Sequence, residues 1–367
     1  MSAMPSAPKL TRQYRTKCAR LLFVFASVLS VTFCAGVRPR TTAENPARIS
    51  VEELWIDPLD LEARDLLHGA GGRALAPDPS APYELIAVDN GGYSPGYDVR
   101  DPQGIDWSVK LGLEAQPEVV VSRVLWAIGY HQPPTYLLPE WQLTGSRAGR
   151  QQRARFRRES DDATVVAEWS WYENPFVTTR PFKGLIVANL ILNNWDWKTS
   201  NNKIYEVTVD GATRRQYVVR DVGASLGKTT LPWIAKWTPF RAMAQGTRND
   251  VDDFDEQGFI KSVSGGRVEF HYRGIHDALI DTVTVDDVMW TCRLLARMSD
   301  DHWHDAFRAA GYDEEQRTRY IVKLRSKIQD GLALGASLAS PAPGSVTKAV
   351  AEQRSDTTDD LFADVAH

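Results

Sequence analysis

The chain has 367 residues, of which 43% are hydrophobic and 25% are charged. This composition excludes a disordered chain and is sufficient for one large domain or for two parts with separate cores. The formal net charge is −4 and the two signs are interspersed, so no global field favours nucleic acid, and we expect no nucleic-acid partner. Of the cysteines, only Cys292 lies clear of the N-terminal segment, which excludes a disulfide framework.

The N-terminus predicts export. Basic residues between Lys9 and Arg20 precede the apolar stretch LLFVFASVLSVTFCAG, which ends in small residues at position 36. This layout is typical of a secretory signal, and the stretch is shorter than the roughly 20 residues of a spanning helix. Residues 1–36 are therefore a signal peptide or an N-terminal membrane anchor, with lipidation of Cys34 as a further alternative. A polar linker over 37–50 follows, and we expect a periplasmic or extracellular protein with a possible membrane tether.

A first domain is predicted over residues 51–135. It begins with an amphipathic helical pattern over 51–67 and continues with three short strands separated by turn residues. We expect the strands to form an antiparallel meander, followed by the helix PEVVVSRVLWAIGY at 117–130. The strands are YELIAV at 83–88, YDVR at 97–100 and IDWSVKLG at 105–112, joined by the turns DNGGYSPG and DPQG.

A second domain is predicted over 136–338, with a disordered tail over 339–367. The six arginines of 145–158 indicate a solvated loop or hairpin, with contact to an anionic partner as the alternative. The all-apolar run GLIVANLIL predicts a buried helix, and the polar loop NNWDWKTSNN at 193–202 follows it directly. Further on we expect the strands KIYEVTV and RQYVVRDVG, and then helices over 286–298, 301–310 and 314–334.

Residues suited to phosphate chemistry occur in a fixed order along these elements. A glycine-rich turn comes first, then a lysine in a strand and a glutamate near a helix start, and later the polar loop and an aspartate at a strand end. This order resembles the protein-kinase superfamily, as a divergent member similar to HipA-like kinases, secretory-pathway kinases and bacterial exported kinase-like proteins. The resemblance implies an α+β, two-lobed kinase-like fold with a small antiparallel β N-lobe and a mainly helical C-lobe. The residues are Gly91, Gly92, Gly96, Lys110, Glu118, Asp196, Lys198, Asn201 and Asp221.

The resemblance also implies a role for each residue. The three glycines would let backbone N–H groups approach the phosphates of ATP, and Lys110 would hold them with Glu118 as its helix partner, or Glu114 if the register differs. In the pattern Asp-x-Lys-x-x-Asn, Asp196 would accept the proton of the attacking hydroxyl and Lys198 would steady the γ-phosphate. The metal ligands for Mg²⁺ or Mn²⁺ would be Asn201 and Asp221.

Three departures from the kinase pattern leave the phosphate acceptor unknown. Asn194 and Trp195 stand where a His-Arg pair usually precedes the catalytic Asp, Val222 replaces the Phe of DFG, and no Ala-Pro-Glu segment follows. A pseudokinase or nucleotide-binding module without catalysis is an alternative that the predicted export motivates, because ATP is scarce outside the cytoplasm. A serine hydrolase is a third interpretation, because GASLG at 223–227 matches the nucleophile-elbow pattern with Ser225 as nucleophile.

Overall fold

The structure is a computed structural model that describes residues 49–91, 93–159, 162–209, 211–229, 246–272 and 276–339. The predicted signal or anchor over 1–36, the linker up to residue 48, Gly92 and the predicted tail from residue 340 lie outside the described residues. Within the ranges that are described, no helix combines the length and the apolar character needed to cross a membrane.

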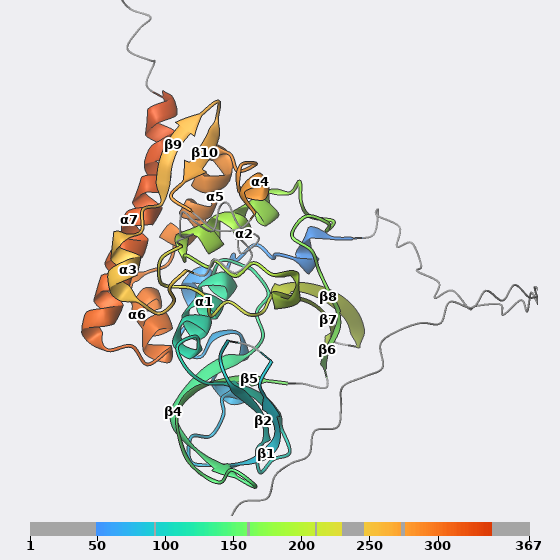
Figure 1. The fold of residues 1–367 in the computed structure, drawn as a ribbon. Helices are drawn as coiled ribbons and strands as arrows, with labels where there is room; N and C mark the ends of the chain where they lie inside the picture. The colour runs from blue at the N-terminus through green and yellow to red at the C-terminus, as the bar shows by residue number, and fades with distance from the viewer. Residues whose placement is uncertain are drawn as a thin grey trace, which may run out of the picture. The chain divides into compact units, whose positions relative to one another are not determined.

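Five strands close into a barrel in the order β1-β2-β3-β5-β4. The predicted meander is confirmed, since β1 pairs with β2 and β2 with β3 in antiparallel fashion. The prediction of a wholly antiparallel sheet is wrong at one place, because β1 pairs with β4 in parallel and so closes the barrel. The barrel also extends past residue 135, where the sequence placed the end of the first domain. The strands are β1 (Pro82–Asp89), β2 (Gly96–Arg100), β3 (Asp106–Lys110), β4 (Thr135–Thr144) and β5 (Gly149–Arg158) (Figure 1).

Aromatic side chains fill the barrel. Trp141 meets Phe156 edge to face with ring centroids 5.2 Å apart, and Trp107 packs against the same Phe156 ring at 6.0 Å. Successive side chains of a strand point to opposite faces. On β5, Ala154 and Phe156 therefore point into this core, and Arg155 and Arg157 point outward.

The outward face of β5 is covered by helix α1 (Ala115–Ala127), which packs on both β4 and β5. For this reason Arg155 and Arg157 are buried, and the prediction of a solvated arginine hairpin is wrong for these two side chains. The predicted helix over 51–67 is also wrong. This segment forms the short 3-10 turns Val51–Glu53 and Leu61–Ala63, because Pro58 disfavours helical conformation in the residue before it.

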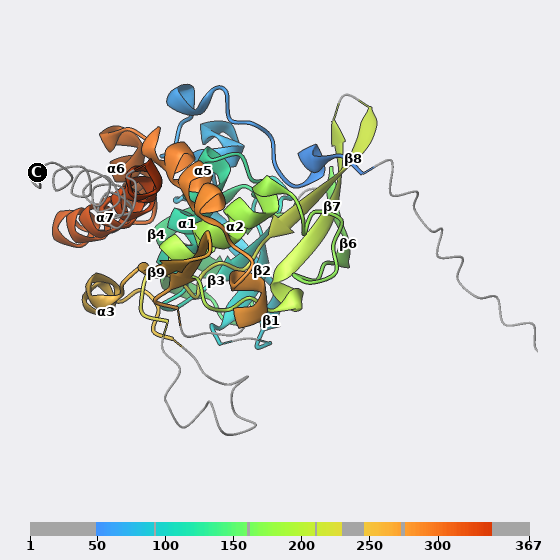
Figure 2. The same cartoon turned by 90° about the horizontal axis from the view of Figure 1, so that it is seen from above.

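The remaining chain is of mixed α and β structure. The strands β6 (Ala163–Glu168), β7 (Asn202–Val209) and β8 (Ala212–Val219) form an antiparallel sheet, which lies away from α6 and α7 in both views (Figures 1 and 2). The predicted buried helix is α2 (Arg180–Ile191), and the predicted C-terminal helices are α5 (Val285–Ala296), α6 (Asp300–Ala309) and α7 (Glu314–Ala339). The other elements are α3 (Val251–Glu256), β9 (Ile260–Ser264), β10 (Arg267–Phe270) and α4 (Asp277–Ile280).

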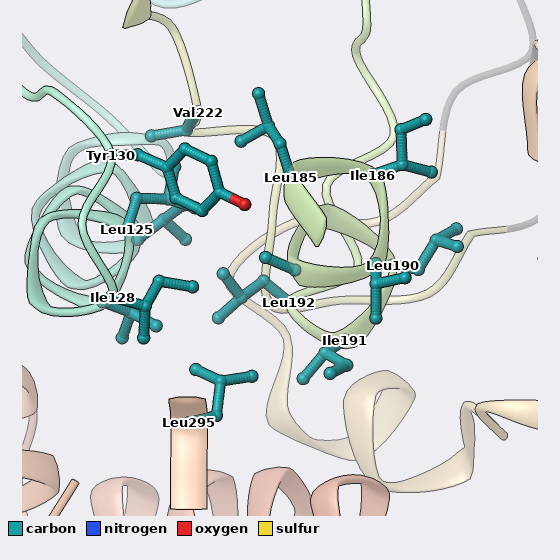
Figure 3. Packing of buried hydrophobic residues seen from close by; sticks show 14 of the residues in the cluster. Leu125, Ile128, Tyr130, Leu185, Ile186, Leu190, Ile191, Leu192, Val222 and Leu295 are labelled. Atoms are coloured by element: carbon teal, nitrogen blue, oxygen red, sulfur yellow. The ribbon is translucent and has the colours of Figure 1, made fainter. Parts of the chain in front are cut away.

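Helices α1 and α2 meet in the largest core. Leu125 of α1 faces Leu185 of α2, and Val222 packs beside both helices (Figure 3). All three side chains are almost fully buried. Because Val222 is fixed in this core, the residue before it, Asp221, is fixed at the edge of the core.

Replacing Gly184 by Ala should destabilise the protein, although Gly to Ala normally favours a helix. An added Cβ at Gly184 in α2 would overlap the Trp290 ring and the Tyr130 hydroxyl. Such overpacking costs about 1–3 kcal/mol, measurable by urea unfolding. The matched control is Gly335→Ala in α7, where the Cβ meets the flexible end of Met289 and no loss is expected. A Gly184→Ala variant as stable as the wild type would show that the packing around Gly184 yields to the extra methyl group.

Candidate functional site

Lys110 at the end of β3 has three carboxylates around its ammonium group. Its Nζ lies 2.5 Å from Oδ1 of Asp221, 3.0 Å from Oε2 of Glu118 and 3.5 Å from Oε2 of Glu114. Burial alone would lower the pKa of Lys110, but Glu118 and Asp221 outweigh it, so the pKa lies above its usual value. The sequence left open whether Glu118 or Glu114 is the partner of Lys110. Both carboxylates contact its ammonium group, and Glu118 is the nearer of the two.

Glu118 joins Lys110 to the two buried arginines. Its Oε1 lies 2.9 Å from Nε of Arg155 and 3.2 Å from Nη1 of Arg157, while its Oε2 faces Lys110. Burial, with the nearby Arg157, lowers the pKa of Arg155 to about 10. Sequence reasoning missed both arginines. The alternation of β5 could have indicated them, because Arg155 and Arg157 share one face of the strand.

Asp221 follows β8 and lies next to the loop that contains Asn201. The backbone N–H groups of Arg220 and Asp221 both donate to the carbonyl of Asn201, at 2.9 Å and 3.4 Å. Burial would raise the pKa of Asp221, but Lys110 and the arginines outweigh it and lower the pKa from 3.8 to about 2. The carboxylate is therefore ionised at neutral pH and available to a cation.

The polar loop begins where helix α2 ends. Asn193 adopts a left-handed conformation with φ of 53°, which terminates the helix. The fully buried Lys327 of α7 donates to the carbonyl of Ile191 at 3.0 Å and to Oδ1 of Asn193 at 2.8 Å. A donor on the last carbonyls of a helix satisfies acceptors that have no partner within the helix. The start of the loop is thus held from a distant helix.

Three of the four loop asparagines donate hydrogen bonds to partners outside the loop. Nδ2 of Asn193 donates to the carbonyl of Gly227 at 2.6 Å, Nδ2 of Asn194 to Oδ1 of Asn189 at 2.8 Å, and Nδ2 of Asn202 to the carbonyl of Trp169 at 3.1 Å. All three are buried. Their amides shape the loop, whereas the side chain of the fourth, Asn201, lines the candidate cavity described below.

Asp196 and Lys198 form an ion pair at the loop surface. Nζ of Lys198 lies 2.9 Å from Oδ2 of Asp196, and the two side chains are 61% and 18% exposed. Nδ2 of Asn201 donates to the backbone carbonyl of Asp196 at 2.8 Å. This bond places Asp196 directly beside Asn201.

A cavity of about 180 Å³ brings several of these residues together. Lys110, Asn201, Asp221 and Gly96 line it, whereas Glu118 lies behind Lys110. Among the described residues, Gly91, Asp196 and Lys198 are not part of the lining. The other lining residues are Asp89, Ser94, Ser108, Val109, Arg155, Arg157, Ser200, Lys203 and Arg220.

The two glycines that the structure describes in the turn between β1 and β2, Gly91 and Gly96, have different roles. A Cβ at Gly96 would lie 2.7 Å from the carbonyl oxygen of Val109, so glycine is required where β2 approaches β3 opposite Lys110. The N–H of Gly91 donates to Oδ1 of Asp89 at 2.8 Å. The predicted third glycine, Gly92, lies outside the described residues.

Oxygen ligands suited to a divalent cation lie in the same cavity. The carboxylate of Asp221 and the amide of Asn201 are the donor types that Mg²⁺ prefers together with phosphate oxygens. The described part of the chain contains no group of three or more His, Cys, Asp or Glu side chains that could hold a metal by themselves. A metal held by Asp221 and Asn201 would complete its coordination with water or phosphate oxygens.

Ser225 does not have the surroundings of a nucleophile. Its side chain is fully buried, and its Oγ donates to the carbonyl of Val222 at 2.7 Å. A nucleophile elbow exposes its serine at the top of a sheet. The GASLG segment instead follows an antiparallel strand and packs into the core, so nothing in the described geometry supports the hydrolase alternative.

No protein-family model matches the chain, and no curated protein is significantly similar to it. Among solved structures, the Helicobacter pylori proinflammatory kinase CtkA is similar with a TM-score of 0.42 and 11% identity, covering 71% of this chain and 100% of that one. A Chaetomium thermophilum Rio2 kinase, solved in a complex with ADP/Mg²⁺ and phosphoaspartate, is similar with a TM-score of 0.27 and 13% identity, covering 68% and 72%. Scores below 0.5 do not establish a common fold.

The stabilising effect of Asp221 should disappear in acid. Because its pKa is 3.8 when unperturbed and about 2 in the fold, its contribution is complete above pH 3.8 and is lost as the pH falls toward 2. The wild type should therefore be more stable than Asp221→Asn at neutral pH, and the difference should narrow in acid. Urea unfolding from about pH 6 to about pH 2 measures this difference. A difference independent of pH would show that Asp221 is not held as a carboxylate by Lys110.

Proposed function

We propose that this chain is a kinase-like phosphotransferase that transfers the γ-phosphate of ATP or another nucleotide to an unknown acceptor with the help of Mg²⁺ or Mn²⁺. One observation carries the proposal: the Lys110 ammonium contacts Glu118 of α1 and Asp221 after β8 beside a cavity that Asn201 also lines. The kinase resemblance of the sequence required these separate segments to meet. In the proposed arrangement the barrel belongs to one lobe and the helices to the other.

The site is suited to phosphate because it combines cations with oxygen ligands. Lys110 would contact phosphate oxygens with its position fixed by Glu118, and Asp221 and Asn201 would hold the divalent ion, which offsets charge on the phosphates. Phosphoryl transfer needs mainly such positioning and charge neutralisation. The described side chains supply both without a covalent intermediate.

Asp196 is the proposed general base. The acceptor hydroxyl oxygen would form a bond to the γ-phosphorus while the bond from that phosphorus to the bridging oxygen breaks, and the nucleoside diphosphate leaves with the electron pair. The hydroxyl proton would pass to the Asp196 carboxylate, whose partner Lys198 is exposed enough to turn toward the γ-phosphate. Acceptor specificity is not encoded by these residues.

A pseudokinase or nucleotide-binding module is the second candidate, and two observations favour it. Asp221 pairs closely with Lys110, where a catalytic site would direct the carboxylate to a metal. Asp196 and Lys198 pair with each other outside the cavity lining. The N-terminal sequence additionally supports export, and we propose a periplasmic or extracellular location.

Replacing Asp196 by Ala should separate binding from catalysis. We expect ATP with Mg²⁺ to raise the melting temperature of both wild type and variant, since a ligand of the native state stabilises it by mass action. Phosphate transfer should fall by about 10²-fold or more in the variant, as expected for loss of a general base. Thermal shift and a radiolabelled transfer assay measure the two effects.

Three outcomes distinguish the candidates. Loss of transfer with retained binding supports the phosphotransferase. Binding without transfer in the wild type favours the pseudokinase, and the absence of a thermal shift at millimolar nucleotide contradicts both. Arg158→Gln is the control variant, because it removes a positive charge on the opposite face of β5. Lys203→Gln would not serve as a control, because Lys203 lines the cavity.

A further inference from the structure

The lining of the candidate cavity is dominated by positive charge. Five cations face two carboxylates there, and Val109 is the one aliphatic side chain among the described residues that line it. Binding sites for flat organic groups are usually built from apolar and aromatic side chains with few polar groups. This cavity therefore has little surface on which a nucleotide base could stack. The cations are Lys110, Arg155, Arg157, Lys203 and Arg220.

The cations form two groups along the strands. Lys110 pairs in register with Arg155, and Ser108 pairs with Arg157, so Arg157 lies two residues further along, a spacing of roughly 7 Å. The carboxylate of Glu118 lies between them, with one oxygen toward Lys110 and the other toward the arginines. One end of the cavity is thus defined by Lys110 and Asp221, and the other by Arg157.

Arg220, which follows β8, contributes to the Arg157 end of the cavity. Its Nη2 lies 2.9 Å from Oε1 of Glu159, and Nε of Arg157 lies 3.8 Å from the same oxygen. Two guanidinium groups that repel each other therefore share the half-exposed Glu159 carboxylate, and Arg157 has Glu118 as a second partner. Burial and the nearby Arg157 also lower the pKa of Arg220. An anion between the two guanidinium groups would relieve this repulsion and form charge-assisted hydrogen bonds.

Apolar side chains suited to a base lie in a separate cavity of about 210 Å³. Arg158 lines that cavity while its neighbour Arg157 lines the first, as expected for opposite faces of a strand. The Arg220–Glu159 ion pair lies at the boundary between the two cavities, because Arg220 lines the candidate cavity and Glu159 lines the apolar one. The apolar residues there are Leu75, Pro133, Pro134, Ala163, Tyr205, Val207 and Val218.

We propose that Arg157 and Arg220 form a second anion subsite. The cavity then binds a linear chain of phosphates, whose negative charges contact Lys110 at one end of the cavity and the two arginines at the other. This inference rests on the proposed function, because it names the chemical class of the phosphate donor. A free inorganic polyphosphate and the triphosphate of a nucleotide share this chemistry. With either ligand the phosphates extend toward Arg157 and Arg220. If the ligand is a nucleotide, its base contributes little to binding.

Calorimetry and thermal shift with three probes test the proposal in the full chain. Inorganic tripolyphosphate with Mg²⁺ should stabilise the protein at least as well as ATP with Mg²⁺, and adenosine should have no effect. Arg157→Gln and Arg220→Gln should each weaken tripolyphosphate binding by about tenfold or more, the loss expected for a charged hydrogen bond. Binding should also weaken as the salt concentration rises.

Two variants serve as controls. Arg158→Gln removes one positive charge from the neighbouring position on β5 and should leave tripolyphosphate binding unchanged. Arg220→Lys keeps the charge and should restore part of the affinity lost in Arg220→Gln. A circular dichroism spectrum like that of the wild type confirms that each variant is folded.

The opposite results would overturn the proposal. If adenosine binds alone, and ATP affinity is unchanged in Arg157→Gln and Arg220→Gln, the base is recognised and the second subsite does not exist, while the phosphotransferase proposal stands. If Lys110→Met and Asp221→Asn leave tripolyphosphate binding intact while the arginine variants abolish it, the subsite stands and the proposed function fails. No response to tripolyphosphate or ATP contradicts both.

Discussion

The ion pair between Lys110 and Glu118 is the interaction on which the candidate site depends. The Glu118 side chain is 2% exposed and the Lys110 side chain 14%, so both charges are largely removed from water and need charged partners, of which each is one for the other. Removing one partner of such a pair typically costs about 3–5 kcal/mol because the other charge is left buried. The pair links α1 to the end of β3, where Lys110 lines the candidate cavity.

A second charged group, centred on Glu114, links the glycine-rich turn to the C-terminal part of the chain. Oγ of Ser94 donates to Glu114 at 2.9 Å, and Arg248 pairs with the same carboxylate. The Arg248 guanidinium also lies 3.7 Å from the centroid of the Tyr93 ring and 4.6 Å from that of Trp195. Cation–π contacts of this kind favour one arrangement of the aromatic rings. The turn, the polar loop and residue 248 are thus held together at one point.

The sequence predicted local elements well and long-range burial poorly. The three-strand meander, the buried helix before the polar loop and the C-terminal helices followed from periodicity and turn residues. Arg155 and Arg157 were expected in solvent because their burial depends on α1, which precedes β4 in the chain and covers β5. Likewise, Asn193 and Asn194 have the residue types of a ligand site, but their partners are Gly227 and Asn189. The alternation of β5 could have placed the two arginines on one face, but the segments that cover them and the partners of the two asparagines lie far away in the chain and cannot be identified from local patterns.

A double-mutant cycle between Lys110→Met and Glu118→Gln tests the central claim most directly. If the two charges hold the barrel and α1 together, the free energies of unfolding of the single variants should not add, and the cycle should give a coupling of about 1–3 kcal/mol. Additivity within about 0.5 kcal/mol would show that Lys110 and Glu118 are energetically independent. That result would contradict the claim that this ion pair links α1 to the end of β3 at the candidate cavity.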